Sequence, residues 1–364
     1  MKVCPRRWWF VLLALVAACN TGPRRSDNAV DPLVYTRCQD PEGQAAWARA
    51  QTALARGDDA AAMPDLVLAT VRCPDLVRAH LARQDAARRL GGAALAAMVE
   101  FYVALPPRNS PVPDYMKARL AETPYAQSNA LQAIVAKDPS FAWAHLSLAR
   151  VTRRQGRLLP ALEMYEAALV NDSQLFEARR ERAQVLAELG REAEAAIDYK
   201  TYLAAVPDDV AALRDYVSLL LYRLTRIDEA NQLLVQLEAK LPGDLSVRMD
   251  RAAALWRSKQ LPESVAAYLS ILEQSPTTVR AAFNIALIYY EIAPTDEAAK
   301  RRYWPRARAA FRWFLDVGGA GSDGHEQFER MLGVPFRLDR IAELIGPEPP
   351  RAVRLDDLRW PANG

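Results

Sequence analysis

The sequence predicts an all-α fold in which similar helix pairs stack one after another. One residue per unit, usually a proline, recurs at intervals of 33, 32, 34, 34, 35 and 34 residues: Pro74, Pro107, Pro139, Ser173, Pro207, Pro242 and Pro276. Each follows an amphipathic segment rich in alanine and leucine, and a proline ends such a helix because it cannot donate the next backbone hydrogen bond. Glycines lie near the middle of four units, where a turn between two helices is needed: Gly57, Gly92, Gly156 and Gly190.

Two positions in the second half of each unit indicate how the helices pack. A small residue is followed four positions later by a bulky one, so both lie on the same helix face. The small residues are Ala62, Ala97, Ala161, Ala195, Ala230 and Ser264, and the bulky ones are Leu66, Phe101, Tyr165, Tyr199, Leu234 and Tyr268. No unit buries its apolar face alone, so stacked units would share one continuous core. We therefore expect one quasi-linear array, although the length of 364 residues suggests two or three domains.

This pattern resembles the tetratricopeptide repeat, a helix–turn–helix unit of about 34 residues. The units that match best are 142–173 and 176–207, followed by 211–242, 245–276 and 43–74. The unit 77–107 is shifted by one residue, 108–139 is degenerate, and a last unit from 279 contains an insertion around 294–304. The resemblance covers residues 43–318. It implies a right-handed superhelical solenoid of about seven to eight units that binds proteins and is not an enzyme.

The first 18 residues are typical of an export signal. A positive start (Lys2, Arg6, Arg7) precedes an apolar run from residue 8 to 18, which is too short to span a bilayer as a helix. The run ends in Val-Ala-Ala-Cys19, which resembles the lipobox of bacterial lipoprotein precursors and implies a signal peptide over 1–18 and lipidation of Cys19. An ordinary secretory signal is the alternative. By the same resemblance, Asn20 favours the outer membrane, and residues 19–42 form a flexible tether.

The C-terminal segment, residues 319–364, departs from the repeat. It contains Gly319, Gly321 and Gly324 in a dinucleotide-like spacing, but no strand pattern precedes them, so a linker is expected. Two short helices are expected at 325–332 and 338–345, where they would cap the solenoid. An extended, proline-rich tail is expected from Gly346 onward.

Composition and charge narrow the possible partners. The chain is 51% hydrophobic and 25% charged, which excludes a disordered protein. The formal net charge of +3 comes from 47 basic and 44 acidic residues. Lys2, Arg6 and Arg7 are the only charged residues among the first 18, so the rest of the chain has 44 charges of each sign. The basic balance therefore gives no support to a nucleic-acid partner.

Residues for catalysis or metal binding are scarce. The chain has only three histidines and four cysteines, and no metal, cofactor or nucleophile motif. His80 and His145 both fall at the fourth position of a first helix, where packing is expected. Cys38 precedes the first helix of the first unit and Cys73 ends its second, and these ends meet in an antiparallel hairpin. In an oxidising compartment they are expected to form a disulfide, with two free thiols as the alternative.

The resemblance also implies where a partner binds. First helices of this family line the concave face, and their ligand-contacting positions hold Arg89, Trp143, Arg150, Arg154, Arg180, Tyr222, Arg223, Trp256, Arg257, Phe283 and Tyr290. Arginine recurs at the thirteenth position as Arg89, Arg154, Arg223 and Arg257, which would form a basic ladder. Such a ladder suits an acidic or carboxylate-ended peptide. Alternatively, these arginines complement helix dipoles and point into solvent.

The sequence thus predicts a lipid-anchored protein-binding scaffold in a bacterial cell envelope, facing the periplasm. The resemblance implies assistance in assembling an outer-membrane protein, pilus, secretion or motility machine. A peptidoglycan- or glycan-binding module, or a regulator of wall enzymes, is the alternative, since Trp143, Trp256 and Tyr290 could stack on sugars. An envelope enzyme with activity in residues 319–364 is the least expected, because no nucleophile–base pair is present.

Overall fold

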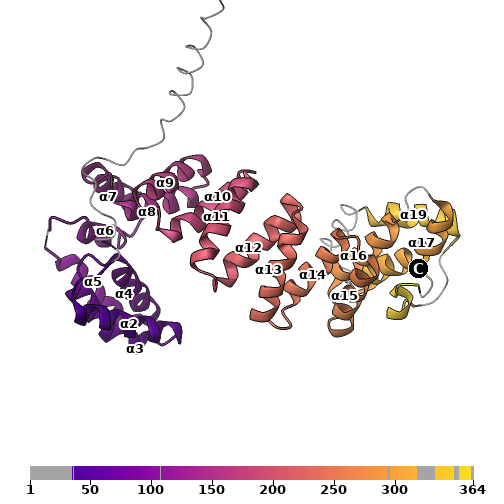
Figure 1. The fold of residues 1–364 in the computed structure, drawn as a ribbon, viewed down its shortest axis with the longest axis horizontal. Coiled ribbons are helices and arrows are strands. Elements are labelled where there is room, and N and C mark those ends of the chain that lie inside the picture. The colour runs from indigo at the N-terminus through magenta and orange to yellow at the C-terminus, as the bar shows by residue number, and fades with distance from the viewer. Residues whose placement is uncertain are drawn as a thin grey trace, which may run out of the picture. The chain divides into compact units, whose positions relative to one another are not determined.

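The chain is all-helical within the residues that a computed structural model describes, which are 35, 37–106, 108–292, 296–317, 333–347 and 352–361 (Figure 1). They form 17 α-helices, a π-turn and a short 3-10 helix, and no strand. The predicted all-α fold of stacked helix pairs is confirmed. The chain divides into two compact units between Ala205 and Val206. The predicted signal peptide and Cys19, with most of the tether, lie outside the described residues.

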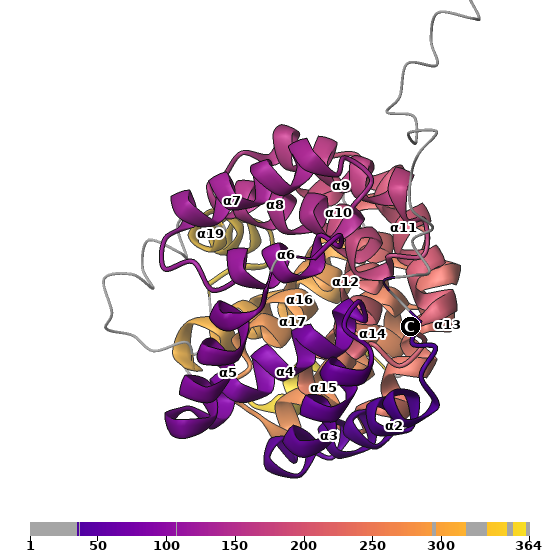
Figure 2. The ribbon, with the colours of Figure 1, turned by 90° about the vertical axis from the view of Figure 1, so that its left-hand side faces the viewer.

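The first unit is a series of consecutive helix pairs. In Figure 2, α4, α8 and α10 lie on the inner side of the curve that this unit makes, and α5 and α9 lie on its outer side. The helices are α2 (Pro41–Ala55), α3 (Asp59–Arg72), α4 (Val77–Leu90), α5 (Gly92–Ala104), α6 (Val112–Ala118), α7 (Pro124–Lys137), α8 (Ala142–Arg154), α9 (Leu158–Asn171), α10 (Phe176–Glu188) and α11 (Glu192–Ala205).

The predicted small and bulky positions form the core between helices. Ala62, Leu66, Ala161 and Tyr165 are all fully buried, as are their counterparts in later units: Ala195, Ala230, Leu234, Ser264 and Tyr268. The unit 77–107 differs, because Ala97 is exposed and the buried pair is Met98 and Tyr102. The one-residue shift noted in this unit therefore moves the core positions by one residue as well.

A side chain at the fourth position of a first helix fastens the turn between units. His80 Nε2 lies 3.0 Å from the carbonyl oxygen of Pro74, and His145 Nε2 lies 2.9 Å from that of Pro139. Arg179 donates to the carbonyl of Ser173 at 3.0 Å in the same way. Each acceptor is six residues earlier in the chain. Because a carbonyl only accepts hydrogen bonds, both histidines carry their proton on Nε2.

The environment of His80 holds this residue in its neutral form. Burial, together with the nearby charges of Arg83 and Arg108, lowers the pKa of His80 to about 4, although the hydrogen bond to the Pro74 carbonyl opposes this. Its Nδ1 lies 2.8 Å from the hydroxyl of Tyr102, which donates to the neutral ring. Protonation of Nδ1 would place a charge on this buried ring, which is unfavourable in the folded state.

His80 should make the first unit sensitive to acid. Its pKa is lower in the folded state than the ordinary value of 6.5, so the unfolded chain binds the proton first as the pH falls. The stabilisation is complete above pH 6.5 and is lost towards pH 4, by about 2 kcal/mol between pH 6.5 and pH 4.5. Urea unfolding at both pH values should show this loss in the wild type and a smaller loss in His80→Gln. Equal losses in the two proteins would contradict the prediction.

The degenerate unit is built from a short first helix. Helix α6 has seven residues, whereas α4 and α8 have 14 and 13. Gln127 occupies the position where other units have a small residue, and its side chain accepts a hydrogen bond from Arg154 of α8 at 3.3 Å. Because α6 is short, the pair α6–α7 shares a smaller contact surface than α2–α3 or α8–α9.

A disulfide and a short arm secure the N-terminal end. Cys38 and Cys73 are bonded, with their Cα atoms 5.3 Å apart, where the start of α2 meets the end of α3. Gly43 lies against both sulfurs, and a Cβ atom at this position would overlap them. Ahead of Cys38 in the chain, the buried Tyr35 packs edge-to-face on Phe141 with ring centroids 4.9 Å apart. The arm, Tyr35 with residues 37–40, therefore joins the first helix pair to the turn before α8.

The second unit continues the helix pairs and absorbs one extra residue. Its helices are α12 (Val210–Leu219), α13 (Ile227–Lys240), α14 (Leu245–Arg257), α15 (Leu261–Gln274), α16 (Val279–Glu291), α17 (Glu297–Val317) and α19 (Val334–Ile345), with the π-turn η2 (Leu220–Leu224) and the 3-10 helix η3 (Leu355–Leu358). The interval Pro207–Pro242 is 35 residues long. The wider π-turn accommodates this extra residue. It ends at Thr225, whose φ is 54°.

The C-terminal segment packs on the last repeat. Helix α19 contacts α17, and Leu358 in η3 is fully buried. Tyr289 donates its hydroxyl to the Leu358 carbonyl at 2.9 Å, and Trp360 stacks on the Tyr289 ring. The prediction of an extended tail is wrong for this part, because apolar residues of the tail cover the last helix pair. The glycine motif at 319–324 and the helix expected at 325–332 lie outside the described residues.

Candidate functional site

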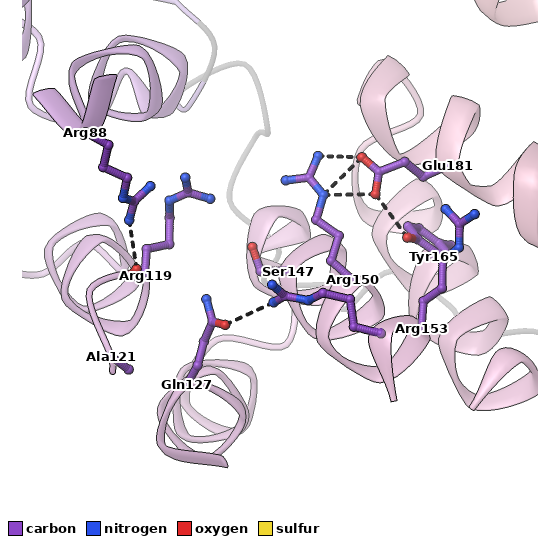
Figure 3. Close-up of a pocket in the computed structure, with 10 residues that line it drawn as sticks. Arg88, Arg119, Ala121, Gln127, Ser147, Arg150, Arg153, Tyr165 and Glu181 are labelled. Atoms are coloured by element: carbon purple, nitrogen blue, oxygen red, sulfur yellow. Dashed lines mark hydrogen bonds and ion pairs between the residues drawn. The ribbon is translucent and has the colours of Figure 1, made fainter. Parts of the chain in front are cut away.

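A basic hollow of the first unit lies near the C-terminal ends of the first helices α4, α6 and α8. It has a volume of about 700 Å³. Figure 3 shows Arg88 and Arg119 on one side of it, facing Arg150 and Glu181 on the other. The lining residues are Arg88, Arg119, Ala121, Gln127, Ser147, Arg150, Arg153, Arg154, Tyr165 and Glu181. We call this hollow the basic pocket.

Glu181 of α10 neutralises one side of the basic pocket. Arg150 Nε lies 3.0 and 2.9 Å from the two carboxylate oxygens of Glu181, and a second guanidinium nitrogen lies 2.5 Å from one of them. Tyr165 donates its hydroxyl to the same carboxylate at 3.0 Å. Burial opposes the charge on Arg150, but the hydrogen bonds and charge of Glu181 raise the pKa of Arg150 above its ordinary value. Glu181 therefore stabilises the charged form of Arg150.

Carboxylates neutralise the charges of the other arginines in the basic pocket to different extents. Arg153 pairs with Glu188 at 2.5 Å, whereas Arg88 and Arg119 share Asp85 at 3.1 and 3.4 Å. The five arginines of the pocket thus face three carboxylates, when the ion-pair partners Asp85 and Glu188 are included. A formal charge of +2 remains.

Arg154 carries part of that excess. Its described hydrogen bond is to the neutral side chain of Gln127, at 3.3 Å, and no ion pair to Arg154 occurs among the described residues. An arginine that faces an open hollow without a carboxylate can bind an acidic group of a ligand in bidentate fashion. The basic pocket is therefore suited to an anionic ligand.

The structure separates the predicted site residues of the first unit. Arg150 and Arg154 line the basic pocket together. Arg89 does not, because it is held by Asp59 on α3 at 2.7 Å. Arg180 is half-buried on α10 and does not line the pocket either.

Trp143 was predicted to line the groove, and this prediction is wrong. Its side chain is 1% exposed and belongs to the core. Arg78 of α4 lies over it, with the guanidinium carbon 5.9 Å from the ring centroid, and the same guanidinium pairs with Glu177 of α10 at 3.2 Å. Arg78 therefore covers the indole from α4 and is held there by its ion pair with Glu177.

The second unit places its predicted residues in a smaller cluster. Tyr222 in η2 is 45% exposed, donates to Asp250 at 2.7 Å, and has Arg257 over its ring at 5.4 Å. Trp256 and Arg257 line a hollow of about 450 Å³ with Thr225, Ile227, Lys259 and Glu291. Arg223 is exposed and does not line it.

The remaining aromatic candidates are engaged in packing. Phe283 contacts Phe314 with ring centroids 5.4 Å apart. Tyr290 stacks on Trp304 at 5.2 Å, and Arg337 lies over the Tyr290 ring at 5.8 Å. Of the three aromatic residues considered for sugar stacking, Trp143 is buried and Tyr290 is partly covered by the protein itself, whereas Trp256 lines the hollow of the second unit.

The four arginines predicted to form a basic ladder do not line one common pocket. Of the four arginines at the thirteenth position, Arg154 lines the basic pocket and Arg89 is paired elsewhere in the same unit. Arg223 and Arg257 belong to the second unit, where Arg257 covers Tyr222. Clustering in the first unit comes instead from neighbouring positions, including Arg88 and Arg119.

Several pocket residues were missed by sequence reasoning. Arg119 and Gln127 lie in the degenerate unit, where the repeat positions could not be assigned. Tyr165 and Glu181 had a signal that could have been found: they are sixteen residues apart and hydrogen-bonded, and so are Tyr268 and Asn284 at 2.9 Å. A tyrosine at the bulky position therefore predicts a hydrogen bond to the sixth residue of the next first helix.

Neither a metal site nor a membrane-spanning helix emerges from the described part of the chain. Its histidine, cysteine and acidic side chains form no group of three or more that could hold a metal ion. None of the helices there is long and apolar enough to cross a bilayer. The chemistry of the described hollows is that of ion pairs and hydrogen bonds.

Comparison with known proteins identifies the repeat. Residues 153–210 and 218–278 match the family model of the tetratricopeptide repeat. The chain therefore contains tetratricopeptide repeats in both compact units. The predicted repeat type is confirmed over these residues. No curated protein matches the chain.

Solved structures that resemble the chain include three repeat proteins. YrrB, described as a TPR protein with an unusual peptide-binding site, is 18% identical with a TM-score of 0.43, over 52% of this chain and 93% of that one. The C-terminal part of a TPR repeat-containing protein from Cytophaga hutchinsonii is 14% identical with a TM-score of 0.47, over 69% and 98%. A tetratricopeptide repeat protein from Parabacteroides merdae is 13% identical with a TM-score of 0.35, over 83% and 99%.

Proposed function

We propose that this chain is a non-enzymatic scaffold that binds an acidic segment of a partner protein in the basic pocket of its first unit. The observation that carries this proposal is the uncompensated charge at Arg154, beside arginines that are already oriented by Asp85, Glu181 and Glu188. Arginines held in place by the protein lose little side-chain entropy when a ligand binds. Part of the pocket, namely Arg153, Arg154, Tyr165 and Glu181, lies within the residues that match the tetratricopeptide repeat.

We further propose that the scaffold is lipid-anchored through Cys19 in a bacterial envelope, where it assists the assembly of an envelope complex. The export signal and the lipobox-like residues before Cys19 support this location. The Cys38–Cys73 disulfide supports an oxidising compartment. In a bacterial host, the wild type should fractionate with membranes and Cys19→Ala should not. Wild-type protein in the soluble fraction would contradict the anchor.

The pocket is tested by reversing the charge of Arg154. Arg154→Glu cancels the +2 charge, so its affinity for a fluorescent peptide with two adjacent aspartates should fall at least about tenfold. Fluorescence anisotropy measures the dissociation constant, and the loss should shrink at high salt because ions screen exposed charges.

The matched control is Arg157→Glu. Arg157 is exposed, lies three residues further along the chain and does not line the basic pocket. It changes the total charge equally, so its effect on binding should be small. Equal losses in the two variants would mean that only the overall charge matters, and the proposed pocket would be wrong.

A further inference from the structure

A second hollow of the first unit lies between α6 and α7. It has a volume of about 860 Å³. Its middle is apolar, and its far end is polar. The apolar lining residues are Ala118, Ala121, Ala126, Ala130, Ala133 and Ile134, and polar ones include Ser110, Asp114, Lys117, Lys137 and Asp138. We call it the apolar hollow.

The apolar hollow exists because the degenerate unit does not fill its own interior. The seven-residue α6 is too short to cover α7, and Gln127 stands where a small residue lets other helix pairs approach closely. The residues of α7 that line the hollow are mostly alanines, whose short side chains leave the space open. An apolar surface left unfilled in this way gains free energy when a ligand covers it.

The apolar hollow and the basic pocket meet at one residue. Ala121, in the turn between α6 and α7, lines both. Gln127 and Ala126 are neighbours in the chain, and they line the basic pocket and the apolar hollow respectively. A ligand that passes Ala121 therefore leaves a basic environment and enters an apolar one.

We propose that the two hollows bind a single ligand, a protein segment that has an acidic end beside Arg154 and Arg119 and apolar side chains in the apolar hollow. This inference rests on the proposed function, because the acidic end is the one assigned to the basic pocket. Charge complementarity fixes the direction of the segment, with its carboxylates at the pocket and its apolar part towards Ile134.

The polar far end of the apolar hollow favours a peptide over a lipid. Lys137 pairs loosely with Asp114 at 3.8 Å, beside Ser110 and Asp138. A peptide backbone that leaves the hollow there finds donors and acceptors for its own polar groups. The end of an acyl chain would have to lie against them, and burying polar groups without hydrogen bonds is unfavourable.

The test compares two fluorescent peptides. Both end in two aspartates, and the rest of the peptide is rich in leucine in the first and in serine in the second. Burial of the leucine side chains removes apolar surface from water, so the leucine peptide should bind at least about tenfold more tightly. Equal dissociation constants for the two peptides would overturn the inference.

Filling the hollow provides the matched variant. Ala133 is an exposed residue of α7 that lines the apolar hollow, whereas Ala136 is exposed on the same helix and lines neither hollow. Ala133→Phe should remove the advantage of the leucine peptide, and Ala136→Phe should leave it intact. Thermal melting followed by circular dichroism checks that both variants are folded, and Ala130→Phe serves as a second filling variant. An unchanged leucine advantage in folded Ala133→Phe and Ala130→Phe would overturn the inference.

The outcomes separate this inference from the proposed function. If Arg154→Glu weakens both peptides but neither filling variant affects the leucine peptide, the basic pocket stands and the composite site is wrong. If Arg154→Glu affects neither peptide, the proposed function itself is wrong. Decanoate is the lipid probe: decanoate binding tighter than that of the leucine peptide, and lost in Ala133→Phe, would overturn the inference in favour of a lipid.

Discussion

Reduction of the Cys38–Cys73 disulfide is expected to lower the free energy of unfolding of the first unit by about 3–4 kcal/mol. The bond closes a loop of about 36 residues, and the chain-entropy model gives this value because reduction frees the unfolded chain. The folded state should change little, since α2 and α3 pack along their whole length. Urea unfolding of the wild type with and without reductant measures the difference.

A variant without either sulfur controls for other effects of the reductant. Cys38→Ala with Cys73→Ala should start at the lower stability and show no response to reductant. If mass spectrometry shows that the wild type is fully reduced and its unfolding curve is unchanged, the disulfide does not stabilise the unit.

Replacement of Trp143 by alanine is expected to cost about 3–5 kcal/mol of stability. The side chain is 1% exposed, and its removal leaves a cavity beneath Arg78. Trp143→Phe should cost less, because it keeps most of the packing and the indole nitrogen has no hydrogen-bond partner among the described residues. Chemical unfolding of both variants gives the two free energies.

Peptide binding by Trp143 variants tests whether this residue belongs to the core or to the ligand groove. A core residue affects peptide binding only through folding, so folded Trp143→Phe should bind the aspartate peptide like the wild type. Normal stability with strongly weakened binding in Trp143→Phe would mean that the indole contacts the ligand, as the repeat positions imply.

The fold was largely predictable because the repeat imposes the same local chemistry in each unit. A proline or serine ends each second helix, and the fully buried Ala161 and Tyr165 lie at the predicted spacing. The exceptions have local causes. The shift to Met98 and Tyr102 follows a unit one residue out of register, and the tail around Leu358 folds back because the last helix pair offers an uncovered apolar face.

The candidate site was predictable only in part. The position of a residue within a repeat indicates which way its side chain points, but not whether a side chain from another repeat covers it. Arg150 and Arg154 were found from their positions in α8. Trp143 is also a groove position of α8 but is covered by Arg78, which is 65 residues earlier in the sequence, so no local pattern predicts this contact. Arg119 belongs to the unit whose pattern is lost, so no repeat position pointed to it.

The arm before α2 determines how the first unit would bear mechanical load. Tension applied to the chain before Tyr35 enters at two places, the aromatic contact with Phe141 and the covalent bond from Cys38 to Cys73. The bond carries the force directly to the end of α3, so α2 lies outside the loaded path and is not unwound from its first turn. A pull on the N-terminal segment would therefore be shared between the first helix pair and the turn before α8, so neither part would bear the whole force.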